Sequence, residues 1–335
     1  MELPEIRLDL RFHVRRLEDR LRHERDQKRN EQMKSYFSTL AAGLSAAVLL
    51  TGCASTSPLK TENLFRDEIP HSAETAADYD ALIYRTDSGM EFYGQILKPA
   101  GSFGGQRPCV LMFHGFAGFG RFDDIGQALC RAGCVVVIPH HRGAWGSPGK
   151  YSISNCVQDA VALVWYMKRV GQWKYHIDPN AVFLIGHSMG GNTVLNAAAE
   201  IPGVRGIVMM APCDIGTMYR QTPKDKMKKF MVENGLEVLH TDGFEAVYAD
   251  LGRHAEQYAF PNAAKKLKNV RLFLVTGAWD TCISNDLLKV FYEIARRNKT
   301  LPDCSFKSYP AKHGLMGVRT QLTRDIADFI VKSLE

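Results

Sequence analysis

The sequence lacks several features that would point to particular classes of protein. It has no internal repeats, no C-x-x-C pair and no long block of arginine and lysine. Its one cluster of lysines, Lys224–Lys229, falls in a helix-like segment and is interpreted as a solvated surface. The formal net charge of +6 is modest for 335 residues and is spread along the chain. These absences exclude a repeat array and argue against a nucleic-acid partner.

Apolar runs long enough to span a membrane are also lacking. The run Leu40–Leu50 is shorter than the ~20 residues that a transmembrane helix needs. It follows a basic start at Met33 and Lys34 and ends on a small-residue junction before Cys53, which is typical of a secretory signal peptide. We therefore expect residues 33–52 to be a signal peptide.

The junction Leu50-Thr51-Gly52-Cys53 resembles the lipobox of bacterial lipoproteins. The resemblance implies that Cys53 carries a lipid and that residues 53–78 tether the protein to a membrane. Ala54 in the second position resembles lipoproteins sent to an outer membrane, so we expect an exported, membrane-anchored protein. The alternative is a chance cysteine after an uncleaved hydrophobic helix.

Residues 1–32 form a charged extension that does not fit a signal peptide, because they hold nine Lys or Arg and eight Asp or Glu. The segment from Met33 to Cys53 is complete as a signal peptide by itself. We hypothesise that translation begins at Met33. A cytoplasmic tail ahead of an uncleaved anchor is the rival interpretation.

Gly186-His187-Ser188-Met189-Gly190 is the most informative stretch of the chain. A strand-like apolar run, Ala181–Ile185, precedes it, and a helix rich in small residues, Gly191–Ala199, follows. Strand, G-x-S-x-G and helix form the nucleophile-elbow signature, in which the turn leaves no room for side chains two residues either side of the serine. The pattern predicts an activated Ser188, against the alternative of a plain Gly/Ser turn.

A serine hydroxyl needs a base and an orienting acid before it acts as a nucleophile. Asp280 follows the buried-strand pattern Arg271–Thr276, and His313 follows the strand-like run Cys304–Tyr309. The order Ser188, Asp280, His313 is that of the α/β-hydrolase triad and differs from other serine hydrolase folds. We therefore predict that His313 is the base and that Asp280 is the acid.

Plainer interpretations exist for these residues. Asp280 would cap the following helix or bind a loop backbone, and His313 would be an ordinary turn histidine. His187, beside the serine, is interpreted as a packing residue. The adjacent His140 and His141 cannot readily share one ion from a strand end, and no third ligand is suitably spaced. No metal and no cofactor are therefore expected.

Short, continuous apolar or β-branched runs recur along the chain, as in strands buried on both faces of a parallel sheet. They lie at 110–113, 134–139, 181–185, 206–210, 271–276 and 304–309, after a strand pair at 81–85 and 91–97. Helical patterns separate most of them, the clearest at Val157–Val170 with a capping-box-like start at Asn155 and Gln158. The alternation predicts an α/β fold with a doubly wound, mostly parallel sheet flanked by helices.

About 60 residues separate the strands that end near Met210 and begin near Arg271, more than a simple crossover needs. We expect a helical lid at residues 213–268, with a helical embellishment packed on the side as the alternative. Three aromatic residues near the predicted site loops are assigned to substrate binding, although core or rim packing is the alternative for each. They are Phe119, Trp145 and Trp279.

The chain has eight cysteines, of which seven remain if Cys53 is lipidated. Cys109, Cys134 and Cys304 lie in or beside predicted strands, where cysteine acts as a small buried residue. No disulfide is predicted. Cys282, two residues after Asp280, borders the predicted site.

From about Ala81 to Leu334 the chain resembles the α/β-hydrolase superfamily, which places the hydrolase domain at residues 79–335. The G-x-S-x-G-G motif at Gly186–Gly191 and the loop Arg142–Ser147 are similar to motifs of the dienelactone-hydrolase-like and prolyl-oligopeptidase-like (S9-type) branch. Peptidases of that branch usually carry a β-propeller, for which this chain has no room.

The same resemblance extends to the loop that holds the oxyanion. In α/β-hydrolases a strand followed by His-Gly forms this loop, and here Val110–Phe113 precedes His114 and Gly115. The resemblance implies an oxyanion hole made by the backbone N–H groups of Phe116 and Met189. His114 is interpreted as shaping this loop.

The motifs and the resemblance together imply a serine hydrolase that works through an acyl-serine intermediate. We expect a carboxylic ester as substrate. A short peptide is the alternative, and a hydrolase-like binding lipoprotein without turnover is the third possibility. The expected partners are a small-molecule substrate and, through Cys53, a membrane.

Overall fold

The computed structural model describes residues 59–67, 72–86, 89–101 and 105–335. The predicted signal peptide at 33–52 and the predicted lipidation site Cys53 lie outside these residues. Within the described part of the chain, no helix is both long and apolar enough to cross a membrane.

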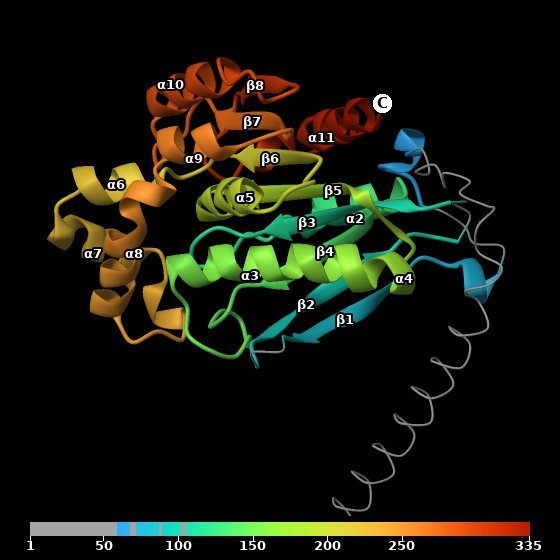
Figure 1. The fold of residues 1–335 in the computed structure, drawn as a ribbon, viewed down its shortest axis with the longest axis horizontal. Coiled ribbons are helices and arrows are strands. Elements are labelled where there is room, and N and C mark those ends of the chain that lie inside the picture. The colour runs from blue at the N-terminus through green and yellow to red at the C-terminus, as the bar shows by residue number, and fades with distance from the viewer. Residues whose placement is uncertain (1–58, 68–71, 87–88, 102–104) are drawn as a thin grey trace, which may run out of the picture. The chain divides into compact units, whose positions relative to one another are not determined.

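One sheet of eight strands lies at the centre of the described chain, in the order β1-β2-β4-β3-β5-β6-β7-β8 (Figure 1). β2 runs antiparallel to β1 and to β4, and the other neighbouring pairs are parallel. This confirms the predicted mostly parallel sheet. The strands are β1 (Asp78–Arg85), β2 (Glu91–Lys98), β3 (Arg107–Phe113), β4 (Val135–His140), β5 (Ile177–His187), β6 (Gly206–Met210), β7 (Arg271–Gly277) and β8 (Cys304–Tyr309).

The central strands β3 to β7 are buried along almost their whole length, because apolar side chains occupy both of their faces. The edge strand β1 differs, since burial alternates along it and Tyr79 and Ile83 are exposed. Five of the six continuous runs in the sequence therefore mark strands inside the sheet, and the sixth, 304–309, is the mostly half-buried edge strand β8.

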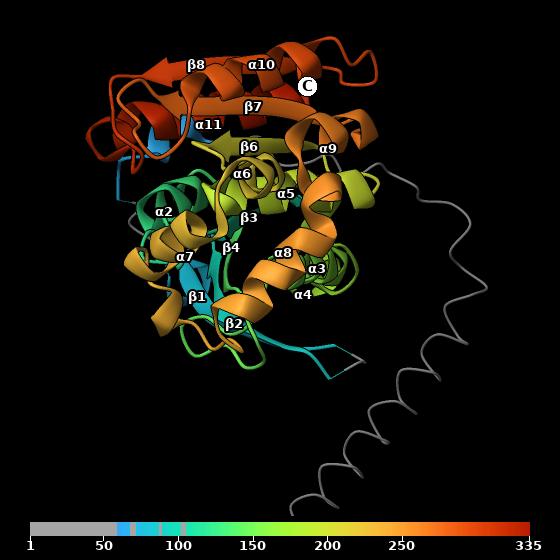
Figure 2. The ribbon, with the colours of Figure 1, turned by 90° about the vertical axis from the view of Figure 1, so that its left-hand side faces the viewer.

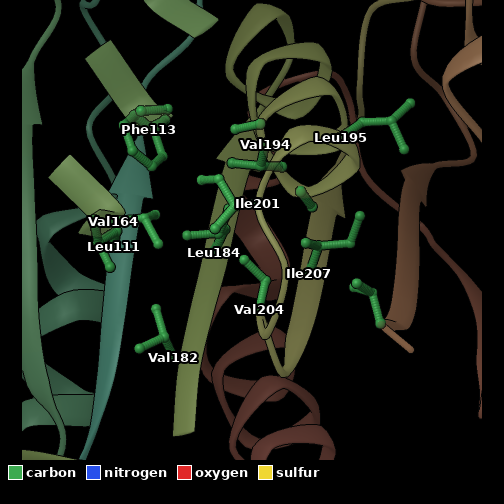
Figure 3. Packing of buried hydrophobic residues seen from close by; sticks show 14 of the residues in the cluster. Leu111, Phe113, Val164, Val182, Leu184, Val194, Leu195, Ile201, Val204 and Ile207 are labelled. Carbon is green, nitrogen blue, oxygen red and sulfur yellow. The ribbon is translucent and has the colours of Figure 1, made fainter. Parts of the chain in front are cut away.

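Helices cover both faces of the sheet, which confirms the predicted doubly wound arrangement (Figures 1 and 2). One face packs against α3 (Ile153–Tyr166), α5 (Met189–Glu200), α9 (Phe260–Lys266) and α10 (Asn285–Arg296), and the other packs against α2 (Asp123–Arg131) and α11 (Arg319–Leu334). Figure 3 shows Leu111, Leu184 and Ile207 of three neighbouring strands beside Val194 and Leu195 of α5. Each fully buried side chain of this kind contributes about 1.5–3 kcal/mol to stability.

Helix α3 corrects one prediction. It begins at Ile153, and its N-cap is Ser152, whose hydroxyl accepts a hydrogen bond from the Asn155 N–H at 3.2 Å. The proposed capping box of Asn155 and Gln158 is therefore wrong, because both residues lie inside the helix. Its expected end before Gly171 is also wrong, since a π-helical turn (Met167–Gly171) leads into α4 (Gln172–Lys174).

The segment between β6 and β7 is helical and lies beyond the C-terminal ends of the strands (Figure 1). It contains α6 (Ile215–Gln221), α7 (Lys224–Glu233), the 3₁₀ turn η4 (Leu236–Val238), α8 (Phe244–Tyr258) and α9. The buried side chains of α6, α7, η4 and α8 form a separate cluster that also includes Met189 at the start of α5, whereas those of α9 pack on the sheet.

Two sets of hydrogen bonds attach this segment to the rest of the fold. The Ser154 hydroxyl and N–H donate to the two carboxylate oxygens of buried Asp250 in α8, at 2.6 and 3.0 Å. The backbone of His240 bonds to that of Gly143 at 2.7 Å and to that of Tyr151 at 2.8 Å. Within this segment, helix α7 precedes both attachment points in the chain, and only its Met227 and Met231 are buried.

Candidate active site

Ser188 stands at the sharp turn between β5 and α5. Its φ of 54° and ψ of −119° lie outside the regions that side chains favour, which costs about 1–3 kcal/mol. Backbone bonds hold the turn in place: the Ser188 N–H donates to the Met210 carbonyl at 3.0 Å, and the Ser188 carbonyl accepts from the Cys213 N–H at 2.9 Å. The serine side chain therefore projects from a fixed, strained backbone.

The two glycines of the motif are needed for this turn, because no side chain would fit at either position. A Cβ at Gly186 would overlap the backbone of Gly190, and a Cβ at Gly190 would overlap the carbonyl oxygens of Phe113 and His114. These contacts are with backbone atoms of the sheet and its loop, which cannot rotate away. The spacing of the glycines thus follows from the close approach of strand, loop and helix.

Replacing Gly190 by alanine is expected to lower the free energy of unfolding by about 2–3 kcal/mol, as overpacking against rigid neighbours does. Gly317→Ala is the matched control, because nothing lies within 4 Å of a Cβ at that position. Urea unfolding of the two variants measures the difference. Equal stability of both variants would show that the turn has room for side chains.

His313 and Asp280 are joined by a hydrogen bond from Nδ1 of the imidazole to Oδ2 of the carboxylate, at 2.8 Å. The other oxygen of Asp280 accepts the N–H groups of Cys282 at 2.8 Å and Ile283 at 3.1 Å. The carboxylate side chain is fully buried, whereas the imidazole remains 24% exposed. This leaves the second ring nitrogen of His313 for another partner.

The carboxylate is electrostatically suited to orient an imidazole. Burial acts to raise the pKa of Asp280, but the hydrogen bond and charge of His313 and the N–H groups of Cys282 and Ile283 lower it below its ordinary value. Asp280 therefore stays ionised at neutral pH. The helix-capping alternative for Asp280 is wrong, because Ser284 caps α10, although Asp280 does bind the loop backbone.

His187 does more than pack, and here the prediction was incomplete. Its Nε2–H donates to the backbone carbonyl of His313 at 2.9 Å, and the two rings lie 4.7 Å apart. Burial, followed by the charge of His313, lowers the pKa of His187 to about 3, so the ring is neutral at physiological pH. The residue before Ser188 thus holds the loop that carries His313, and nothing in the local sequence indicates this contact.

The loop after β3 lies directly against the serine. A Cβ at Gly115 would come within 3.0 Å of the Ser188 Cβ, so glycine permits this approach. Phe116 and Met189, the predicted oxyanion donors, both line the cavity that contains Ser188. His114 is buried and its Nδ1–H donates to the Gly115 carbonyl at 2.8 Å, which fits a role in shaping the loop.

A cavity of about 120 Å³ opens at the serine. His313 and Cys282 line one part of it, and Phe119 also contributes. Apolar side chains from the segment between β6 and β7 form much of the remaining wall: Ile215, Met218, Met227, Phe230 and Met231. None of the described lining residues is Asp, Glu, Lys or Arg.

Two of the three predicted substrate-binding aromatics do not line this cavity. Trp145 turns towards the oxyanion loop, where its indole N–H donates to the Ala117 carbonyl at 2.8 Å. Trp279 follows β7, and its side chain is 61% exposed outside the cavity. Substrate binding by Trp145 and Trp279 stays a prediction, since the structure shows only that neither side chain lines this cavity.

Comparisons with known proteins find similarity over parts of this chain. The family model described as serine aminopeptidase, S33, matches residues 104–241. The chain is 28% identical over 159 residues to monoglyceride lipase of Rattus norvegicus, covering 47% of each protein. It is also 30% identical over 112 residues to human pancreatic lipase-related protein 3, covering 32% of this chain and 23% of that protein. The chain thus matches about half the length, or less, of these relatives.

Solved structures show the same fold. Est1E from Butyrivibrio proteoclasticus superposes with a TM-score of 0.59 at 16% identity, covering 76% of this chain and 98% of that one. Puromycin hydrolase superposes with a TM-score of 0.56 at 17% identity, covering 80% of this chain and 39% of that one. These likenesses establish the α/β-hydrolase fold for this chain.

Proposed function

We propose that this chain, which has the α/β-hydrolase fold, is a serine hydrolase that cleaves carboxylic esters through an acyl-serine intermediate. One observation carries the proposal. Ser188 and His313 line a single cavity, and His313 is hydrogen-bonded to buried Asp280. Nucleophile, base and orienting acid come from loops after β5, β8 and β7, which lie at the C-terminal edge of the sheet where ligands bind in such folds.

In the proposed reaction, Nε2 of His313 takes the proton from Ser188 as the hydroxyl oxygen attacks the ester carbonyl. Asp280 holds Nδ1–H and stabilises the imidazolium that forms. The N–H groups of Phe116 and Met189 bind the oxyanion, each contributing about 3 kcal/mol to the transition state. The imidazolium then protonates the leaving alcohol, and a water activated by His313 releases the acyl group.

The cavity wall favours an ester over a peptide N-terminus. An aminopeptidase has to pair the ammonium group of its substrate, because an unpaired charge is costly away from water. The described wall offers no carboxylate for this purpose, since the Asp280 side chain is buried behind His313. The resemblance to a lipase, which covers 47% of that protein, also favours an ester, whereas the matching family model supports the peptidase alternative.

Hydrolysis of p-nitrophenyl butyrate beside a proline p-nitroanilide tests this choice. We expect turnover of the ester and none of the anilide. The oxyanion site can bind either acyl group, but the apolar cavity wall has no partner for the charged ammonium group of the anilide. Faster cleavage of the anilide would support the peptidase. Turnover of neither would support the binding lipoprotein.

The size of the cavity indicates a short to medium acyl chain. A cavity of about 150 Å³ in another protein binds benzene, so about 120 Å³ admits a chain of roughly four to six carbons. Helix α7 sets part of this limit, because Met227 and Met231 are its buried residues and both line the cavity. We propose that the segment at 213–268 is a lid that selects acyl chains.

Met227→Trp is expected to shift the preference towards acetate. The larger ring fills the acyl space, and each methylene that no longer fits is worth about 1–3 kcal/mol, or at least ~10-fold in specificity. The measurement is the ratio of kcat/KM for p-nitrophenyl hexanoate to that for the acetate. Val232→Trp, exposed on the same helix, should leave the ratio unchanged. An unchanged ratio in Met227→Trp would refute the acyl role of α7.

We also propose that Cys53 carries a lipid that anchors the protein to a membrane on the exported side. The proposal is based on the lipobox-like sequence alone. Acyl chains stabilise membrane binding by ~0.8 kcal/mol per buried CH₂, so several chains anchor firmly. Mass spectrometry of the native N-terminus tests it: a lipid-modified Cys53 is expected, and native peptides from residues 8–29 would contradict processing at this site.

A further inference from the structure

Cys282 brings a third donor atom to the pair formed by Asp280 and His313. It lies in the loop after β7, is exposed and lines the cavity. One ligand atom from each of Asp280, Cys282 and His313 lies within 4.8 Å of the others. A carboxylate oxygen, a thiol sulfur and an imidazole nitrogen therefore converge on one small volume.

These donor types match a thiophilic divalent cation. Zn²⁺ is bound tetrahedrally by Cys sulfur, His nitrogen and carboxylate oxygen, and sites with three protein ligands keep water in the fourth position. We propose that Asp280, Cys282 and His313 form an inhibitory site for Zn²⁺ or a similar cation. The binding site stands on the donor geometry, and the inhibition rests on the function proposed above.

The geometry requires one adjustment. With metal–ligand bonds of about 2.0–2.2 Å, Nδ1 and the carboxylate oxygen must lie about 3.4 Å apart, against 2.8 Å in the hydrogen bond. The His313 ring is partly exposed, which allows this small opening. The second oxygen of Asp280 keeps its two backbone N–H donors, which orient the carboxylate for the cation.

The positions of the protons on His313 explain how the cation would inhibit hydrolysis. On binding, the Cys282 thiol releases its proton to solvent, and the cation takes the place of the hydrogen on Nδ1 of His313. The neutral imidazole then carries its hydrogen on Nε2, since one ring nitrogen is protonated and the other is coordinated. A protonated Nε2 cannot accept the proton of Ser188. The cation therefore removes the base without any redox or covalent step.

Metal titrations of the full chain test this site in two ways. Co²⁺ is added to the wild type, and thiolate-to-cobalt charge-transfer absorption is recorded; Zn²⁺ binding is then measured by calorimetry. Cys282→Ser should lose the absorption from this site and bind one Zn²⁺ fewer than the wild type. Cys304→Ser is the matched control, because Cys304 lies at the opposite end of β8 from the His313 loop, and it should retain both signals.

Inhibition of ester turnover is measured with each protein compared to its own metal-free rate. Loss of a ligand is expected to weaken Zn²⁺ inhibition at least ~10-fold in Cys282→Ser and not in Cys304→Ser. Equal absorption, stoichiometry and inhibition in wild type and Cys282→Ser would overturn the site. Cobalt absorption needs no turnover, so an inactive protein with a Cys282-dependent band refutes the hydrolase proposal and keeps the metal site.

Discussion

Replacement of Ser188 by alanine is expected to lower kcat for p-nitrophenyl butyrate roughly 10⁶-fold, as loss of the nucleophile does in other serine hydrolases. The oxygen that forms the acyl bond is gone, and no neighbouring hydroxyl stands on the strained turn between β5 and α5. The oxyanion donors and the cavity remain, so a residual acceleration of about 10³–10⁴ over water is expected. Steady-state kinetics with purified protein measures the loss.

The fold of the Ser188→Ala variant should be intact, because only one oxygen atom is removed. The backbone strain at position 188 should also be unchanged, since alanine has a Cβ as serine does and adopts the same backbone conformation. Ser308→Ala, at an exposed position of β8, is the matched control and should retain full activity. If Ser188→Ala kept more than a few per cent of wild-type kcat, the nucleophile would be another group.

Asp280→Asn is the second change with a large expected effect. The asparagine amide would face Nδ1 of His313 with a donor where the carboxylate now accepts, which favours the wrong imidazole tautomer. In serine proteases of another fold the equivalent change lowers kcat about 10⁴-fold, and we expect a similar loss. The kinetics should show the loss in kcat, because the cavity that binds the ester is unchanged.

The same substitution removes a pH-dependent part of the stability. The pKa of Asp280 is lowered in the folded protein, so its ionised form stabilises the fold above the ordinary pKa of aspartate, and this contribution is lost as the pH falls through the folded pKa. Asp280→Asn should therefore make the stability of the protein depend less on pH at acid pH.

Asp286→Asn, exposed at the start of α10, is the control for both the kinetic and the stability measurements. If Asp280→Asn lowered kcat less than ~10-fold, Asp280 would only stabilise its own loop and would not orient His313.

The positions of strands β3 to β7 along the chain could be predicted, because burial on both faces produces continuous apolar runs in the sequence. β6 and β8 have the predicted bounds, and β4 and β7 differ by a residue at one or both ends. The start of α3 could not be predicted correctly, since Ser152, Asn155 and Gln158 all suit a helix start and only the surrounding fold selects Ser152.

The candidate site was predictable where backbone geometry demands particular residues. The glycines at 186 and 190 are required by contacts with backbone atoms, so they mark the turn of Ser188 from sequence alone. The contact of His187 with the His313 carbonyl joins residues that are 126 positions apart, and no local pattern encodes it. The direction of the Trp145 side chain could not be predicted, because it depends on a hydrogen bond to the Ala117 carbonyl, 28 positions away in the sequence.

Labelling with a fluorophosphonate probe, followed by digestion and mass spectrometry, tests the central claim most directly. The probe phosphonylates only a serine that a base has activated, so the modified peptide identifies the nucleophile. We predict a single adduct on Ser188, blocked by prior incubation with substrate and absent from Ser188→Ala. An adduct on a different residue, or ester turnover by a protein whose Ser188 stays unmodified, would contradict the account.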